Sequence, residues 1–393
     1  MEIKEFTKSY IEKSSPDEDR LFKDFLDSKE PYTSIFANNP WLKPPDFKNP
    51  LKFDGQYWDT TVGRKHPFWK TKKLPSPTKE IKQIRKDFEK WGYALIEDGM
   101  SQDQCRIFIE RLLEQAEGEK LAGVKSMTPS GQYVHTLINK GEVFRKCIEQ
   151  DTDAVQAGIL IEKFLNETLG DGWICHSFLA NGAEKGFYPQ VLHLDQSPLS
   201  PWITEDAPAL VNTLYIPQDV NEDNGGTLII PGSHKNIIKA GSNGKVGKLN
   251  PAINLEAKAG TIMLFDGRLL HGTGVNKTDK IRFVAAMSNV KSWMRSQENW
   301  IISVDPEIIK SASPKLLHRM GMQAATYGGT IEGFGMGASG RINESFGSIK
   351  HFREAFDSGE YIRVGELSPH STKKDLNKKY TLKDAIKAAK SSN

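Results

Sequence analysis

Two histidines and an aspartate are spaced so that their side chains could hold one metal ion. His193 and Asp195 occupy alternate positions, and alternate side chains of an extended strand project from the same face. His271 comes later in the chain, beside Gly272, which leaves room for a metal. Two histidines and one carboxylate leave the other coordination positions of a metal open, as is typical of non-haem Fe(II) centres that react with dioxygen. The spacing therefore predicts an iron site, with zinc as the less favoured occupant.

Arg282 is a further candidate, because it lies in an apolar stretch, residues 280–287, that predicts a buried strand. A buried guanidinium needs an anionic partner, and its planar fork pairs with a carboxylate through two parallel hydrogen bonds. That partner is either a carboxylate of the protein or a dicarboxylate ligand. The position of Arg282 shortly after His271 favours the ligand.

Taken in order, these four residues resemble the pattern of the phytanoyl-CoA dioxygenase-like (PhyH) family of Fe(II)/2-oxoglutarate-dependent oxygenases. The resemblance covers about residues 80 to 320. It includes residues 224–234, which are similar to the family's strand and turn between the two groups of ligands, and residues 293–299, just after the Arg282 strand. Four elements in the family's order are much more specific than a His-x-Asp triplet alone.

The resemblance implies a role for each of these residues. His193, Asp195 and His271 are the implied iron ligands. Arg282 is implied to pair with the distal carboxylate of 2-oxoglutarate. Family members often place further contacts to this co-substrate at three more positions, which in this chain are Gln190, Thr227 and Thr273.

Three other side chains are candidates for a substrate pocket, namely His176, Trp202 and Trp293. Each has a structural alternative, since a tryptophan is commonly part of core packing and an interior histidine commonly has its hydrogen bonds satisfied. His234 follows a Pro-Gly-Ser turn signature, so it is predicted to be a hydrogen-bonded turn residue rather than a ligand.

The fold is predicted to be mainly β with flanking helices. Short apolar runs separated by clusters of Gly, Asn, Asp and Pro recur over about residues 173–292, a pattern typical of antiparallel sheets. A helix is predicted from about Thr78, a strand over Tyr93–Ile96, and a second helix opened by a capping box of Ser101 and Gln104. The resemblance implies a double-stranded β-helix, the jelly-roll or cupin-like core, with the metal at its mouth.

Composition divides the chain into four segments. Residues 1–77 are rich in proline and aromatic residues, which predicts an extension packed on the core, with a disordered arm as the alternative. Residues 78–302 form the predicted oxygenase domain. Residues 303–367 are predicted to be a helical and glycine-rich extension that serves as a substrate lid or as a packing loop, and residues 368–393 a solvated basic tail.

Charge and cysteine usage narrow the class of protein. The chain has 393 residues and a net charge of +3, so nothing calls for a nucleic-acid partner, and no apolar run is long enough to span a membrane. The charged first residues do not form the apolar core of a secretory signal, which predicts a cytoplasmic protein. Three widely separated cysteines predict buried thiols rather than disulfides or a zinc site. The sequence does not indicate an oligomeric state.

The function implied by the resemblance is a dioxygenase that uses Fe(II), 2-oxoglutarate and O2. It would convert 2-oxoglutarate to succinate and carbon dioxide while oxidising, most commonly hydroxylating, a substrate C–H bond. The balanced charge disfavours a nucleic-acid substrate, and the expected substrate is a small, partly apolar metabolite. Two alternatives stay open at this point: a cupin-like metal-binding protein without turnover that engages a protein partner, and a peptide or protein hydroxylase, which would need a long open groove.

Overall fold

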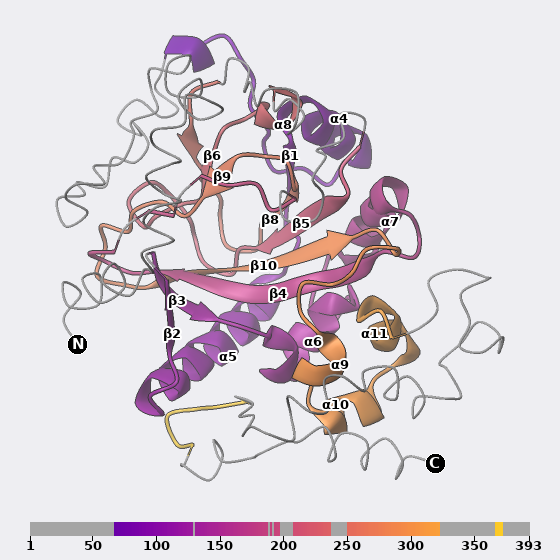
Figure 1. Ribbon diagram of the computed structural model, residues 1–393. Helices are drawn as coiled ribbons and strands as arrows, with labels where there is room; N and C mark the ends of the chain where they lie inside the picture. Colours follow the sequence, from indigo (N-terminus) through magenta and orange to yellow (C-terminus); the bar gives the residue numbers. More distant parts are fainter. Residues whose placement is uncertain are drawn as a thin grey trace, which may run out of the picture. The chain divides into compact units, whose positions relative to one another are not determined.

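Antiparallel strands form two sheets in the computed structural model, which describes residues 67–128, 130–187, 189–190, 192–196, 207–236, 250–322 and 366–371 (Figure 1). The larger sheet has seven strands in the order β1-β8-β5-β10-β4-β3-β2, and the smaller has three in the order β7-β6-β9. The strands are β1 (Tyr93–Ile96), β2 (Ser126–Thr128), β3 (Gly131–Val134), β4 (Ile174–Ala183), β5 (Leu210–Tyr215), β6 (Leu228–Ile229), β7 (Ile253–Asn254), β8 (Ile262–Asp266), β9 (His271–Gly272) and β10 (Arg282–Val290).

Helices precede, interrupt and follow this run of strands. The described helices are η3 (Pro67–Trp69), α4 (Ile81–Trp91), α5 (Gln102–Leu121), η4 (Leu137–Asn139), α6 (Glu142–Ile148), α7 (Gly158–Leu169), α8 (Ser233–Asn236), α9 (Trp300–Ser303), α10 (Pro306–Ser311) and α11 (Pro314–Arg319). None of them is long and apolar enough to cross a membrane. The prediction of antiparallel sheets with flanking helices is confirmed.

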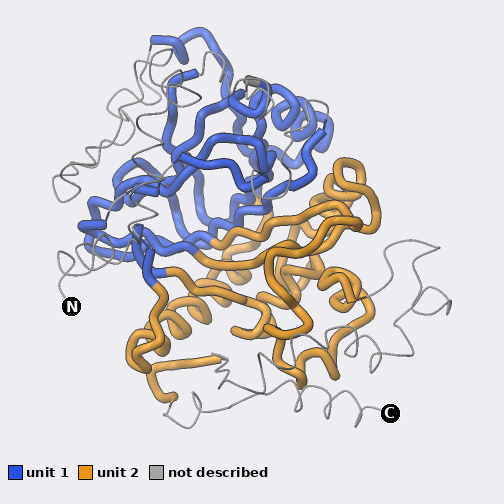
Figure 2. Tube along the Cα trace, in the orientation of Figure 1, with its two compact units in different colours: residues 1–97, 127–132, 181–284 blue, residues 98–126, 133–180, 285–393 orange. Residues whose placement is uncertain are grey.

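The chain divides into two compact units (Figure 2). The first unit comprises residues 1–97, 127–132 and 181–284, and the second comprises residues 98–126, 133–180 and 285–393. Of the predicted proline-rich extension, only residues 67–77 are described, and Trp69 there lies edge-on to Trp91 of α4, with ring centroids 5.9 Å apart. The rest of that extension, the glycine-rich segment and most of the basic tail lie outside the described residues, so the four-segment organisation stays a prediction.

In the first unit, β8 lies between β1 and β5 and pairs with both in antiparallel register. Phe265 of β8 is opposite Tyr93 on one side and Asn212 on the other. All residues of these three strands are buried, which accounts for their nearly continuous apolar sequence. α4 ends at Gly92, whose φ of 79° is the left-handed conformation that favours glycine at a helix end.

In the second unit, α5 begins with the predicted capping box. The Ser101 side chain accepts from the Gln104 N–H, and the Gln104 side chain accepts from the Ser101 N–H. The helix buries Cys105, Phe108, Leu112 and Ala116, and the three cysteines are all buried free thiols, as predicted. Leu113 lies on the flank of this buried face and is 38% exposed.

A short C-terminal segment, residues 366–371, docks on α5 within the second unit. Leu367 is 2% exposed, and its N–H donates to Oε1 of Gln115 at 2.7 Å. Its carbonyl accepts from the guanidinium of Arg111. A Cβ at Gly118 would lie only 2.7 Å from the Cβ of Leu367, so the absence of a side chain there opens the docking position.

We predict that Leu367→Ala lowers the free energy of unfolding by about 2–5 kcal/mol, because it leaves a cavity against α5. Urea titration followed by circular dichroism would measure the change. Leu121→Ala is the matched control, since Leu121 lies at the end of the same helix but is 63% exposed. Equal effects of the two substitutions would contradict the docking contact.

Charged side chains are buried together in the second unit. Lys140 lies 3.6 Å from a carboxylate oxygen of Glu119, which also accepts from Gln115 at 2.9 Å. Oε1 of Glu298 accepts from the Phe178 N–H at 3.1 Å. Burial raises the pKa of Glu298 to about 7, more than this hydrogen bond and the charge of Lys140 lower it. Burial also lowers the pKa of Lys140 to about 8.

We predict that Glu298 makes the protein less stable as the pH rises from about 4.5 to about 7. In this window the unfolded chain ionises the carboxyl while the folded protein still holds its proton, so the free energy of unfolding falls, by up to about 3 kcal/mol. Glu298→Gln removes this dependence, and urea unfolding at a series of pH values would show it. The exposed Glu307 provides the control substitution Glu307→Gln. An unchanged pH profile in Glu298→Gln would contradict the assignment.

Candidate metal centre

His193 and His271 are brought together by backbone pairing. His271 lies in β9, opposite Ile229 of β6, and forms an isolated antiparallel bridge with His193. The N–H of each histidine donates to the carbonyl of the other, at 3.0 and 3.2 Å. Directly opposite residues of an antiparallel pair project to the same face, and the two imidazole rings lie 4.4 Å apart between centroids.

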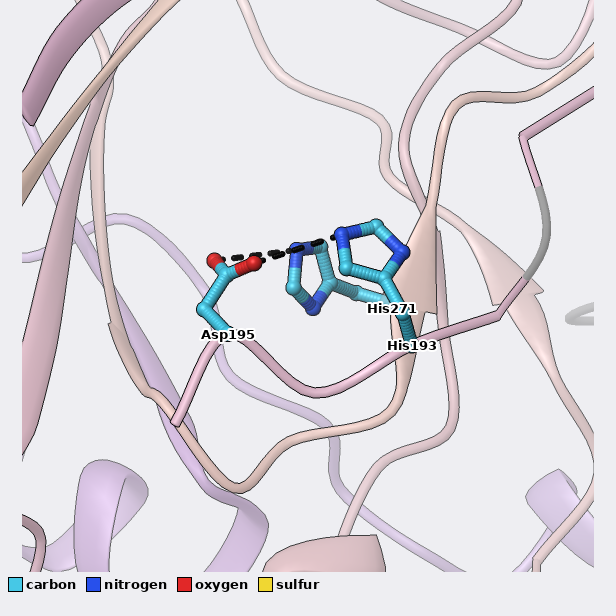
Figure 3. Close-up of side chains that lie close together, drawn as sticks. All are labelled: His193, Asp195 and His271. Carbon is cyan, nitrogen blue, oxygen red and sulfur yellow. Dashed lines mark ion pairs between the residues drawn. The ribbon is translucent and has the colours of Figure 1, made fainter. Parts of the chain in front are cut away.

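Asp195 reaches the same place from a turn (Figure 3). The prediction that an extended strand carries both His193 and Asp195 is therefore wrong for the aspartate, because the chain turns there and the Gln196 N–H donates to the carbonyl of Gly267 at 2.9 Å. The carboxylate oxygens of Asp195 lie 3.3 Å from Nε2 of His193 and 3.4 Å from Nε2 of His271.

This donor set fits a divalent metal ion. One ligand atom from each of His193, Asp195 and His271 lies within 4.8 Å of the others, and this is the metal-type cluster found among the described residues. Burial raises the pKa of Asp195, but the charges and hydrogen bonds of His271 and His193 lower it by more than burial raises it. The pKa of this carboxyl is therefore well below its usual range. An ionised carboxylate is the form that binds metal.

The ring of His271 is oriented by the backbone. Its Nδ1 lies 2.9 Å from the carbonyl of Leu269, an acceptor, so Nδ1 carries the proton in this hydrogen bond. Nε2 is the ring nitrogen on the side of Asp195, 3.4 Å from its carboxylate, and it can bind a metal when it carries no proton. In a metal-binding histidine, a hydrogen bond from the ring nitrogen that does not bind the metal commonly fixes the tautomer and the orientation of the ring.

Arg282, the first residue of β10, is buried in the first unit without an acidic partner among the described residues. Its Nε donates to the carbonyl of Asn224 at 3.2 Å, and Nη2 donates to the carbonyl of Gly225. Nη1 is buried and has no hydrogen-bond partner in the described part of the chain. Burial lowers the pKa of Arg282 to about 10, so the guanidinium stays charged at neutral pH.

The turn that contacts Arg282 depends on two glycines. Gly225 has a φ of +78°, and a Cβ there would lie 2.7 Å from the carbonyl oxygen of Gly274. A Cβ at Gly274 would lie 2.5 Å from the carbonyl oxygen of Gly226. Backbone therefore packs directly on backbone beside the guanidinium, which a side chain at either position would prevent.

Two of the predicted co-substrate residues form one hydrogen-bonded chain. The Thr273 hydroxyl donates to Oε1 of Gln190 at 3.1 Å, and the Gln190 N–H donates to the Thr273 carbonyl at 2.9 Å. Asn181 of β4, which sequence reasoning missed, donates to the Thr273 hydroxyl at 2.6 Å. Thr227 is buried just before β6, and its carbonyl accepts from the Leu255 N–H at 2.7 Å.

The candidate pocket residues have different surroundings. His176 is buried in β4 and accepts at Nδ1 from the Gln297 N–H at 2.9 Å, a structural hydrogen bond. Trp293 is 73% exposed, and Trp202 lies outside the described residues. Nε2 of His234 lies 3.0 Å from the Glu89 carbonyl. His234 is therefore hydrogen-bonded, as predicted, but it lies in the short helix α8 rather than in a turn.

Comparison with known proteins identifies the family. The family model described as Phytanoyl-CoA dioxygenase (PhyH) matches residues 88–284, half of the 393-residue chain. The chain belongs to the phytanoyl-CoA dioxygenase family. The matched range contains all three residues of the metal cluster and Arg282. The predicted family and, with the antiparallel sheets described above, the predicted fold class are confirmed.

Curated proteins are similar to part of the chain. Dioxygenase af480 of Aspergillus fumigatus is 32% identical over 162 residues, which cover 40% of this chain and 51% of that protein. Dioxygenase sphC of the same species is 28% identical over 194 residues, covering 48% and 51%. The chain thus spans about half the length of these relatives. Among solved structures, the non-heme alpha ketoglutarate dependent carbocyclase SnoK from nogalamycin biosynthesis has a TM-score of 0.45 and 16% identity, over 57% of this chain and 92% of that one.

We predict that His193→Ala and Asp195→Ala each weaken Fe(II) binding by more than about 100-fold, because each removes one of the three side chains of the metal cluster. Anaerobic equilibrium dialysis with metal analysis would measure the affinity. His135→Ala is the control, since His135 is exposed and is not part of the metal cluster. Wild-type affinity in either ligand variant would exclude that residue from the site.

Proposed function

We propose that this protein is an Fe(II)/2-oxoglutarate-dependent dioxygenase. The observation that carries the proposal is the buried guanidinium of Arg282, whose Nη1 has no partner among the described residues, in the same unit as a cluster of two histidines and one carboxylate. A dicarboxylate co-substrate would supply the missing anion. The 2-His-1-carboxylate cluster would supply the iron.

His193, Asp195 and His271 would hold Fe(II) in this proposal. When bound, iron supplies dioxygen chemistry that couples decarboxylation of 2-oxoglutarate, giving succinate and carbon dioxide, to oxidation of a substrate C–H bond. The protein's contribution is to keep the Asp195 carboxylate ionised and the His271 ring in the tautomer that exposes Nε2. Both conditions hold before a metal arrives.

Arg282 would bind the distal carboxylate of 2-oxoglutarate. Its Nε and Nη2 already donate to the carbonyls of Asn224 and Gly225, so the guanidinium is fixed in place before the co-substrate binds. A buried charge without an opposite charge is unfavourable, and a carboxylate that pairs with it recovers that free energy. Gln190, Thr273 and Thr227 would add hydrogen bonds to the co-substrate.

The uncompensated charge of Arg282 also favours an enzyme over a metal-binding protein without turnover. A protein that binds only a metal has no carboxylate ligand to offer this guanidinium, and the described residues supply none. We further propose that the substrate is a small, partly apolar metabolite that is hydroxylated. The curated relatives carry the name dioxygenase, which agrees with the reaction class.

We predict that Arg282→Met weakens 2-oxoglutarate binding by at least about 30-fold and changes Fe(II) affinity by only a few-fold. The reason is that one partner of a buried charge pair contributes about 2–5 kcal/mol to binding. Anaerobic titration with Fe(II) and then 2-oxoglutarate, followed by the weak visible charge-transfer band of the chelate, would measure both steps.

The exposed Arg85 provides the control substitution Arg85→Met for this titration. Unchanged 2-oxoglutarate binding in Arg282→Met would remove the role assigned to this residue. Wild-type protein that binds Fe(II) but gives no band with 2-oxoglutarate would contradict the dioxygenase proposal itself and support a metal-binding protein without turnover.

A further inference from the structure

Asn212 is a buried amide in an apolar strand, and it contacts a proposed iron ligand. It lies in β5 at 0% exposure, and its Nδ2 donates to Oδ2 of Asp195 at 2.8 Å. Burying an amide is unfavourable unless it is hydrogen-bonded, so an asparagine at this position needs a polar partner. A hydrogen bond to a carboxylate is among the stronger kinds.

The strand neighbour of Asn212 contacts a second proposed ligand. Phe265 of β8 is directly opposite Asn212, and directly paired residues of antiparallel strands share one face of the sheet. The Phe265 ring lies 4.7 Å from the ring of His271, between centroids, in an edge-on arrangement. One cross-strand pair therefore contacts Asp195 by a hydrogen bond and His271 by ring packing.

The turn that carries Asp195 is tied to the same strand. Oε1 of Gln196 accepts from the N–H of Ala209 at 2.9 Å and of Leu210 at 3.4 Å, at the start of β5. These bonds place the backbone of the turn, but they leave the carboxyl group of Asp195 able to rotate. Oδ2 of that group lies 3.4 Å from Nε2 of His271, and the Asn212 amide holds the same oxygen at 2.8 Å from outside the metal cluster.

We infer that Asn212 is a positioning residue for the metal centre, which orients the carboxylate of Asp195 and so raises the affinity of the site for its metal. The inference rests on the proposed iron site and deepens it. It requires no contact between Asn212 and the metal, because the amide acts through Asp195. Partners of this kind commonly change metal affinity by about 10- to 100-fold.

The test uses Asn212→Leu, which replaces the amide with an apolar group of similar size, and Asn212→Ala, which is smaller and easier to accommodate. Thr213→Val is the matched control, since Thr213 is the next residue of β5, is equally buried and projects to the other face. Anaerobic competition with a chelator would measure the affinities for Fe(II) and Co(II). The visible absorption of bound Co(II) reports its coordination, and melting of the metal-free proteins reports stability.

We expect both Asn212 variants to bind Fe(II) and Co(II) about 10- to 100-fold more weakly than wild type and to alter the Co(II) spectrum. Thr213→Val should keep the wild-type metal affinities and Co(II) spectrum, even if the melting temperature of its metal-free form is as low as that of the Asn212 variants. Affinity within about twofold of wild type in a folded Asn212 variant would overturn the inference, as would equal losses in Thr213→Val. If the wild-type protein bound neither metal, the proposed iron site itself would be overturned, and this outcome is distinguishable from failure of the Asn212 inference alone.

Discussion

The candidate site depends on the reciprocal backbone hydrogen bonds between His193 and His271. These two bonds join segments that are far apart in the sequence, and they place two imidazoles on one face without any contribution from the side chains. The geometry of the pair is therefore set by the backbone of β9, the edge strand of the smaller sheet, with which His193 pairs. Asp195 needs only a turn directly after His193 to complete the cluster.

Polar side chains also lie within buried strands of the first unit. Asn181 of β4, Asn212 of β5 and Arg282 at the start of β10 are buried polar residues in strands of the larger sheet. Asn181 contacts Thr273 and Asn212 contacts Asp195, both within the first unit. A stable core alone would favour apolar residues at these positions. These polar residues are more readily explained by a role in ligand or metal binding than by a contribution to the stability of the fold.

Local patterns in the sequence correctly predicted those structural elements that depend only on residues adjacent in the chain. The strand Tyr93–Ile96 and the capping box of α5 appear where they were expected, because both are determined by a few adjacent side chains. The residues of the metal cluster were also identified, by family resemblance. The turn at Asp195 and the contacts of Asn181 and Asn212 could not be predicted, because they depend on the pairing of distant strands, and a single sequence does not reveal register.

The docking of Leu367 on α5 shows that the packed structure extends beyond the residues that the family model matches. The family match ends at residue 284, yet Leu367 fills a position that Gly118 keeps open, and its backbone supplies partners for Arg111 and Gln115. A protein trimmed to the matched region would expose apolar surface on α5 and leave these polar groups to water. The boundary drawn by sequence similarity thus cuts through a packed interior, and an excised core would be prone to aggregate.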